Sequence, residues 1–296
     1  MGKFIYPFTD FGFKYIFGSK TSGEFLKDFL NSLFEDDPRF SPITEIKYEN
    51  PEKTKRSKDE KSVIYDIHCT TSNGKKFIVE MQNGSQEFFV ARSVYYVSMT
   101  IVEQGEPGYQ WHYELMPVYF IGFMNFSLPS LGDKVKVDAM LMDVDLKQPI
   151  TDKVRYIFIQ LPNFKKEASE CETAFDKWIY TLKHLDKMET IPFLHDNPVF
   201  HRLESVTNYA NLSKEEKRQY DHDLKVARDL DATISYAEKR GLKKGEAKGI
   251  AKGIAQGRAE ERNNMVLSMS EEGFPIETIA KIARLSVSEV RRILEG

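Results

Sequence analysis

The chain has 296 residues, of which 41% are hydrophobic and 29% are charged, and its formal net charge at pH 7 is −3. These values are typical of a soluble globular protein with one large domain, or with a core and appendages. They exclude a basic character over the whole chain, so any surface that binds nucleic acid has to be a local patch.

The cysteines and the apolar runs indicate the compartment. Two cysteines, Cys69 and Cys171, are too few for a disulfide framework, and no Cys/His cluster has zinc-ligand spacing. A reducing, cytoplasmic environment fits this composition best. The longest apolar run, Leu115–Leu128, is too short to span a bilayer and contains Pro117, so we expect a buried strand and no membrane partner.

The first half of the chain predicts one order of elements, α-β-β-β-α-β. From apolar periodicity we expect, in chain order, a helix at 22–34, a strand at 43–48, a strand pair within 63–82, a helix at 86–103 and strands at 116–123, 135–142 and 154–161. The charged segment Lys53–Lys61 is expected to be a solvated loop, with contact to a DNA backbone as the alternative.

After about Pro162 the pattern changes from strands to helices. Helical spacing predicts helices at 168–185, 199–210 and 214–239. We therefore place a boundary near Leu161, which separates a domain over 1–161 from a helical region over 162–238.

A small-residue repeat occupies 239–265. Glycine recurs at every fourth position from Gly241 to Gly257, and each glycine costs a helix about 1 kcal/mol relative to alanine. Two interpretations stay open. The repeat is either a half-flexible helical linker or a helix through which two copies of the chain associate as a homodimer.

The tail over 266–296 predicts two short helices, at 276–283 and 287–295. Arg284, Leu285 and Ser286 form the turn between them, and Ser286 is a suitable N-cap. The pattern resembles a helix-turn-helix. From Lys239 to the end the net charge is +4, which leaves DNA binding and a simple packing hairpin both open.

The strand pair within 63–82 holds an acid in each strand, Asp66 and Glu80. A two-residue turn at Asn73 and Gly74 would put these acids on opposite faces of the pair. A three-residue turn that begins at Ser72 places Asp66 directly across from Glu80. It also gathers one uninterrupted apolar face: Val63, Tyr65, Ile67, Cys69, Phe77, Val79 and Met81. Burial of that face selects the three-residue turn.

Two carboxylates opposite each other in a sheet repel. Either both are solvated on a polar sheet face, or a cation lies between them. Mg²⁺ is the natural cation, because it binds through one or two carboxylates and keeps several waters. The residues alone leave both interpretations open.

The surrounding motifs resemble a known family. Asp66 followed by Glu80-Met81-Gln82, within an α-β-β-β-α-β order, resembles the PD-(D/E)XK nuclease core. With FTDFGFKYIFGS before it and ARSVYYVSMTIVEQGEPGY after it, the chain resembles the recombination-promoting nuclease and putative transposase (Rpn-like) family. The resemblance covers most of the first 160 residues, and the repeat and tail more loosely.

The resemblance implies a fold and an activity. The fold would be α/β, a mixed-sheet PD-(D/E)XK core followed by an α-helical C-terminal region. The activity would be metal-dependent endonuclease cleavage of double-stranded DNA, tied to recombination or mobile elements. Asp66 and Glu80 would bind Mg²⁺, with Mn²⁺ as a substitute. Gln82 stands where most such enzymes have lysine, and a neutral amide only orients water, so cleavage should be slow or conditional.

Five further residues are weaker candidates. Glu24 would be a third metal ligand, or a solvated helix charge. Asp10 and Lys14 match the family's opening motif, with Lys14 near the substrate phosphate, or they form a structural i,i+4 pair. Arg92 would clamp a phosphate, or make an ordinary salt bridge. His68 would hold water or phosphate on the polar face, or be a bystander.

Two other functions stay open. A DNA-binding or assembly protein with a degenerate nuclease core is consistent with Gln82 and with the absence of an overall basic charge. An RNase on the same fold is the second, because a fold does not fix a substrate.

Overall fold

The computed structural model describes residues 2–19, 22–50, 52–53, 63–84, 88–108 and 111–295. Residues 54–61 of the predicted charged loop therefore lie outside the described ranges. The chain forms two compact units, Met1–Asp231 and Ala232–Gly296. None of the described helices combines the length and the apolar character needed to cross a membrane.

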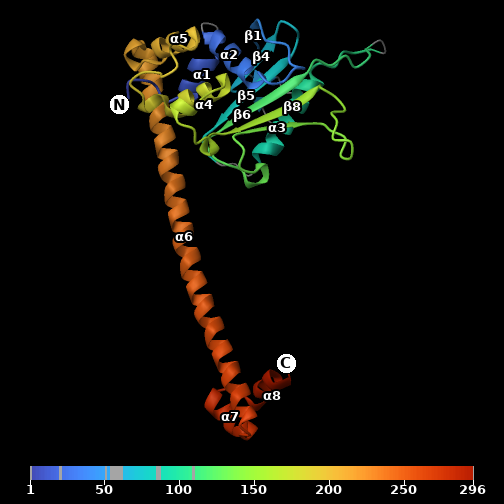
Figure 1. The fold of residues 1–296 in the computed structure, drawn as a ribbon, viewed down its shortest axis with the longest axis vertical. Coiled ribbons are helices and arrows are strands. Elements are labelled where there is room, and N and C mark those ends of the chain that lie inside the picture. The colour runs from blue at the N-terminus through green and yellow to red at the C-terminus, as the bar shows by residue number, and fades with distance from the viewer. Residues whose placement is uncertain are drawn as a thin grey trace. The chain divides into compact units, whose positions relative to one another are not determined.

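A six-stranded mixed sheet lies at the centre of the first unit (Figure 1). Its strands, in spatial order, are β1 (Ile46–Tyr48), β4 (Ile67–Thr71), β5 (Lys76–Gln82), β6 (Val118–Met124), β8 (Val154–Gln160) and β7 (Lys136–Met140). The pairs β5–β6 and β6–β8 are parallel, and the other three pairs are antiparallel. The predicted strands and the mixed α/β class are confirmed. Two short strands, β2 (Glu52–Lys53) and β3 (Val63–Ile64), pair separately.

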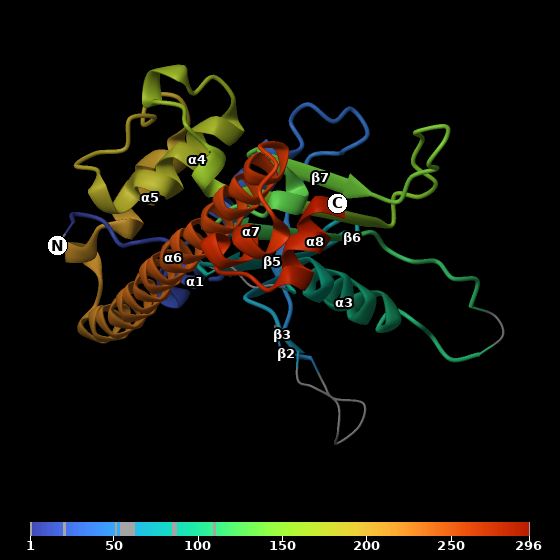
Figure 2. The same ribbon diagram turned by 90° about the horizontal axis from the view of Figure 1, so that it is seen from below.

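Helices cover both faces of this sheet (Figures 1 and 2). One face packs against α1 (Asp10–Phe17), α2 (Gly23–Leu33), α4 (Ala174–His184) and α5 (Pro198–Thr207), and the other against α3 (Phe89–Val102). Successive side chains of a strand point to opposite faces, so Phe77 and Val79 enter the first layer while Ile78 enters the second. Both layers exclude water, which explains why β6 is buried throughout.

The register of the β4–β5 hairpin is the predicted one. Ile67 lies opposite Val79 and Cys69 opposite Phe77. Gly74 adopts a φ of +79°, a conformation that glycine reaches without strain. Its N–H donates to the Thr71 carbonyl at 2.9 Å, which closes the three-residue turn. The prediction that burial and turn chemistry choose this register is confirmed.

The first strand of that hairpin departs from the prediction at Asp66. The chain bends there, between β3 and β4. As a result Tyr65 packs beside Phe89 under α3, and the expectation that it shares a face with Ile67 is wrong. The interpretation in which both acids are solvated on a polar sheet face does not hold for Glu80. Since α3 covers that side, Glu80 is only 3% exposed and His68 only 4%.

Helix α1 is an element that the sequence pattern did not single out. Thr9 caps its N-terminus, where the hydroxyl oxygen accepts a hydrogen bond from the Gly12 N–H at 2.9 Å. Phe13, Ile16 and Phe17 then enter the core. A threonine before an apolar run with 3.6-residue spacing is a helix-start signal, and it could have revealed this helix.

The helical region after the sheet belongs to the same compact unit. Trp178 of α4 and Phe200 of α5 are buried with Phe29 of α2, and ring centroids of Trp178 and Phe200 are 5.2 Å apart. The expected boundary near Leu161 marks the end of the last sheet strand. The compact unit itself continues to Asp231.

Helix α6 (Lys214–Glu271) is continuous through the glycine repeat. The helix predicted at 214–239 and the repeat therefore form one helix, and both interpretations of the repeat expected a helical segment. Around the repeat glycines the space is open, because a Cβ added at any position from Gly241 to Gly257 in the series would meet no atom within 4 Å. The repeat is helical without a packing partner among the described residues.

The second unit has a small core of its own. The end of α6 packs with α7 (Ile276–Ala283) and α8 (Val287–Glu295), and both short helices have the predicted bounds. The buried residues are Val266, Ile279, Ala280, Ala283 and Val290. Ser286 caps α8 as predicted, since its hydroxyl accepts from the Glu289 N–H at 3.2 Å.

Candidate active site

Asp66 and Glu80 lie opposite each other, just beyond the last residue pair of the β4–β5 strand pairing. The Asp66 N–H donates to Glu80 Oε1 at 3.1 Å, and the Met81 N–H donates to Asp66 Oδ2 at 2.8 Å. Each carboxylate thus accepts a backbone N–H from the facing strand, in place of a regular carbonyl partner. The bend at Asp66 makes room for this exchange and fixes both side chains between the strands.

Burial makes this pair an unfavourable place for two negative charges. Burial, followed by the charge of Asp66, raises the pKa of Glu80 to about 8. Burial also raises the pKa of Asp66, although the Met81 N–H works against that shift. At neutral pH the pair therefore holds a proton, or requires a positive charge beside it.

Two cationic side chains, Lys14 of α1 and Arg92 of α3, act on the pair. Their charges lower the pKa values of both carboxylates, and burial outweighs them. Arg92 packs over the ring of Phe89, with its guanidinium carbon 5.2 Å from the centroid. A substrate phosphate near the carboxylates would meet positive charge from both sides of the sheet.

The motif near the N-terminus holds an acid, Asp10, beside its lysine, Lys14. Lys14 Nζ lies 2.7 Å from Asp10 Oδ1, so the two form the i,i+4 pair. Burial lowers the pKa of Lys14, but its bond to Asp10 more than offsets this and the pKa is raised. The charge of Asp10 also raises the pKa of Asp66, and the charge of Lys14 lowers it. Both residues of this motif therefore act electrostatically on Asp66.

Gln82 ends β5, two residues beyond Glu80, and so lies on the same side of the strand. Its carbonyl accepts from the Asn125 N–H at 2.9 Å, which extends the β5–β6 pairing. The side chain of the next residue, Asn83, donates to the Phe8 carbonyl. The end of β5 is thereby tied to the chain just before α1, close to Asp10 and Lys14.

Glu24 has a different partner. Its Oε1 lies 2.8 Å from Arg202 Nε, so the residue joins α2 to α5. The acid whose charge acts on Asp66 is Asp10 instead. Within the described ranges, no group of three or more His, Cys, Asp and Glu side chains is arranged to hold a metal ion. Asp66 and Glu80 are therefore the donors to consider.

His68 lies deep under α3. Its ring makes an edge contact with Tyr65, with centroids 5.5 Å apart, and its strand position faces Ile78. Such burial favours the bystander interpretation over contact with a phosphate. The neighbouring Tyr65 hydroxyl is held by Thr100 at 3.0 Å, so this part of the layer is packed and hydrogen-bonded.

The two carboxylates fit a hard divalent cation. Carboxylate oxygens are the ligands that Mg²⁺ prefers, and Mg²⁺ needs only one or two of them because water completes its shell. Each carboxylate uses one oxygen for the backbone bonds described above, so the second oxygen can bind a cation without breaking them. A cation would also lower both pKa values, because its charge favours the ionised carboxylates. The residues that would hold it are Asp66 and Glu80.

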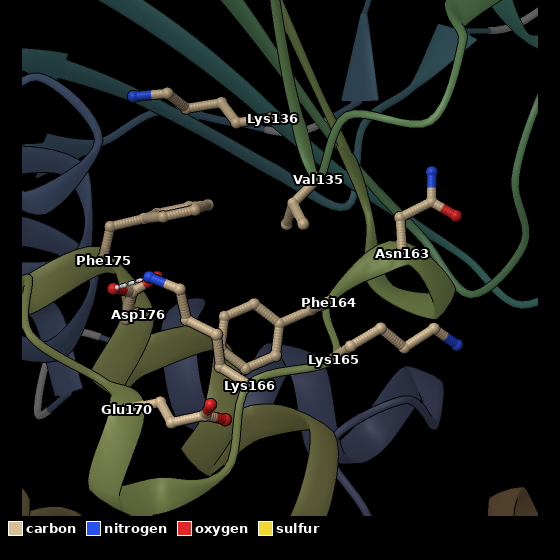
Figure 3. Close-up of a pocket in the computed structure, with 9 residues that line it drawn as sticks. All are labelled: Val135, Lys136, Asn163, Phe164, Lys165, Lys166, Glu170, Phe175 and Asp176. Carbon is tan, nitrogen blue, oxygen red and sulfur yellow. Dashed lines mark hydrogen bonds and ion pairs between the residues drawn. The ribbon is translucent and has the colours of Figure 1, made fainter.

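A separate hollow of about 530 Å³ contains none of the candidate residues (Figure 3). Two of its lysines, Lys136 and Lys166, already have partners. Lys166 Nζ lies 2.6 Å from Asp176 Oδ2, and Lys136 Nζ donates to the Leu33 carbonyl at 2.8 Å. The hollow is lined by Val135, Lys136, Asn163, Phe164, Lys165, Lys166, Glu170, Phe175 and Asp176. Its contacts hold β7 and α4 together, which is a structural role.

A comparison with family models decides the relationship. The model described as PD-(D/E)XK nuclease family transposase matches residues 7–237. The chain belongs to this family. The match confirms the resemblance and the fold class, and it supports a role as a nuclease of mobile elements. It includes α1 and the whole sheet, and ends within α6, before the second unit's core.

Membership of the PD-(D/E)XK family also bears on the cofactor, because nucleases of this class generally use divalent metals. Neither a curated protein nor a solved structure matches the chain. The geometry of the carboxylate pair is therefore the closest source of information on the chemistry.

Proposed function

We propose that the protein is a metal-dependent endonuclease that hydrolyses phosphodiester bonds in double-stranded DNA, in recombination or movement of mobile elements. The supporting observation is the pair of half-buried Asp66 and buried Glu80, which face each other in a chain of this nuclease family. Nothing in ordinary packing requires two like charges at this place, and a cation would satisfy both.

Each residue has a distinct role in this proposal. Asp66 and Glu80 hold Mg²⁺, for which Mn²⁺ substitutes. When bound, the ion would lower the pKa of water and neutralise charge on the phosphate. Gln82 orients water through its amide, because it has donors and an acceptor but no charge. Lys14 and Arg92 supply the fixed positive charge that a lysine at position 82 would otherwise give.

The test is cleavage of supercoiled plasmid with Mg²⁺ and, separately, with Mn²⁺. Glu80→Gln removes one metal ligand with little change in volume. Glu35→Gln is the matched control, because Glu35 is exposed at the end of α2 and away from the pair. We expect wild type and the control to cleave and Glu80→Gln to be inactive. Equal cleavage by all three proteins would assign the activity to another site or to a contaminant.

A degenerate core is the second candidate, and the neutral Gln82 favours it. In that case no protein cleaves, divalent metals do not bind, and the variants Asp66→Asn and Glu80→Gln keep full DNA binding. Titration calorimetry with Mn²⁺ separates the two candidates. The same cleavage assay with labelled RNA as competitor tests the RNase alternative.

We also propose that the active form is a dimer, because two copies would present two cutting sites to the two strands of a duplex. Sedimentation of the full chain, and of a chain that ends after Lys239, tests this. A monomer in both cases would contradict it.

A further inference from the structure

The second unit contains a structure that the nuclease site does not use. It has its own buried core, and that core lies beyond the residues that match the nuclease family. Two short helices, α7 and α8, pack on the end of α6 around Val266, Ile279 and Val290. Three packed helices of this kind are enough to hold a surface helix in a fixed orientation.

The connection between α7 and α8 is a tight turn of three residues. Arg284 ends α7 in the left-handed conformation, with φ 55° and ψ 44°, and the Leu285 N–H bonds back to the Ala280 carbonyl at 3.0 Å. Ser286 then starts α8, where the Glu289 side chain accepts from the Ser286 N–H at 2.8 Å. This capping box fixes the first turn of α8. A three- to four-residue turn between crossing helices is the geometry of a helix-turn-helix.

Helix α8 has two chemically different sides. Val290 is buried, and Val287, Ile293 and Leu294 pack with it against the unit's core. The outward side consists of exposed residues at i, i+3, i+4 and i+7 spacing, which places them on one face opposite Val290: Ser288, Arg291, Arg292 and Glu295. These residue types hydrogen-bond to base edges, arginine to guanine and glutamate to cytosine.

Positive charge is concentrated in this unit. Residues 232–296 contain 12 Lys and Arg against 9 Asp and Glu, a net charge of +3, while residues 1–231 have a net charge of −6. Lys281 of α7 and Arg284 of the turn are exposed, like Arg291 and Arg292. No ion pair with another described residue engages any of these four cations. They are available to an anionic partner.

We propose that the second unit is a DNA-binding helix-turn-helix whose recognition helix is α8. The outward face, Ser288, Arg291, Arg292 and Glu295, enters the major groove, and Lys281 and Arg284 contact flanking phosphates. DNA is favoured as the partner because the face combines a fixed surface helix with unpaired cations. This binding activity is distinct from the proposed cleavage and does not depend on it.

The test measures binding of the full-length chain to labelled duplex DNA in EDTA, so that no cleavage occurs. The wild type first selects sequences from a random duplex pool, and fluorescence anisotropy then gives the dissociation constants for the enriched sequence. The test variant is Arg291→Gln/Arg292→Gln. The matched control, Lys248→Gln/Lys252→Gln, removes two exposed cations from the glycine repeat of the same unit. All four positions are exposed, so circular dichroism should show both variants folded.

We expect the α8 variant to bind the selected sequence at least about 10-fold more weakly and to lose the preference for it. The control should lose only a few-fold and keep the preference. Equal losses in the two variants would overturn the proposal, because they would indicate bulk charge alone. Unchanged DNA binding with altered sedimentation in the α8 variant would also overturn it, since the face would then be a protein interface.

The binding assay in EDTA separates this inference from the proposed nuclease, because it includes no cleavage step. If the nuclease proposal fails and this binding result holds, the tail is a DNA-binding module on an inactive core. If cleavage is found but the α8 variant binds normally, only the helix-turn-helix proposal fails.

Discussion

Carboxylates at the two ends of the central parallel strands have opposite electrostatic surroundings. At the end where β8 begins, Arg155 lies between two acids, with Nη1 2.6 Å from Asp37 Oδ2 and Nη2 2.5 Å from Asp138 Oδ2. At the end where β5 finishes, Asp66 and Glu80 face each other, and burial outweighs the charges of Lys14 and Arg92 that act on them.

The pKa values follow this difference. Hydrogen bonds from Arg39 and Arg155 hold the pKa of Asp37 well below its usual range, although partial burial opposes them. Burial and mutual repulsion raise the pKa of Glu80 to about 8. At the first end the acids and arginines neutralise one another, as in a structural ion-pair cluster. At the second end the two carboxylates require a cation from outside the protein, as in a binding or catalytic site.

The largest expected effect is on cleavage. Asp66→Asn keeps the shape of the side chain but removes a metal ligand and its charge. We expect cleavage to fall at least ~10³-fold, because the ion's contribution to the barrier is several kcal/mol. Asp138→Asn is the control at the other end, and it should cleave within about twofold of wild type when compared at equal folded concentration. Similar losses in the two variants would remove the distinction between the ends.

The second effect is on stability at the Arg155 cluster. Arg155→Met leaves Asp37 and Asp138 facing each other, and the side chains of Arg155 and Asp37 are only 12% and 11% exposed. We expect the free energy of unfolding in urea to fall by about 2–3 kcal/mol. Adding Asp37→Asn should restore part of that loss. A change below about 0.5 kcal/mol would show that solvent already screens the cluster.

The third effect concerns pH and the metal-free protein. The pKa of Glu80 is about 8 in the folded state, above the value of an unfolded glutamate. Its contribution to stability is therefore fully present below about pH 4.3, and is lost as the pH rises through 8. Glu80→Gln cannot ionise, so in EDTA its stability relative to wild type should grow between pH 5 and 7, by about 2.5 kcal/mol. Urea titrations at several pH values measure this, and Mg²⁺ should reduce the gap.

The smallest effect is expected for Lys14→Met. Lys14 favours the charged forms of both carboxylates and is itself 44% exposed on its side chain, so solvent screens its charge. We expect cleavage to fall about tenfold, because a fixed charge near the phosphate is lost. Lys47→Met, at an exposed position of β1, is the control. Equal activity of the two variants would remove Lys14 from the site.

The sequence predicted the hairpin and its facing acids well because local rules determine them. Gly74 fixes the turn, and the apolar alternation of β5 fixes which side is buried, so only one register satisfies both. Tyr65 was misplaced because the bend at Asp66 comes from side-chain bonds to the facing strand. Alternation along a strand contains no information about such a bond.

Contacts between distant charged residues could not be read from the chain. Arg155 and Asp37 are 118 positions apart, and Glu24 forms an ion pair with Arg202 on another helix. Charged side chains on a surface follow no period, so their pairing depends on the finished fold. Asp10 and Lys14 were recognisable as a local pair, but their proximity to Asp66 depends on how α1 packs beside β5. The sequence left two interpretations of the repeat in α6 open, because each of its glycines weakens a helix.

The glycines of the repeat affect how soon this part of α6 unfolds locally. Each weakens the helix by about 1 kcal/mol relative to alanine, and the repeat makes no side-chain packing among the described residues that would offset the loss. Amide hydrogens from Gly241 to Gly257 should therefore exchange with deuterium early, while those of α4, which is anchored by Trp178, stay protected until the unit unfolds. A protease added to the native protein should make its first cut in the same stretch.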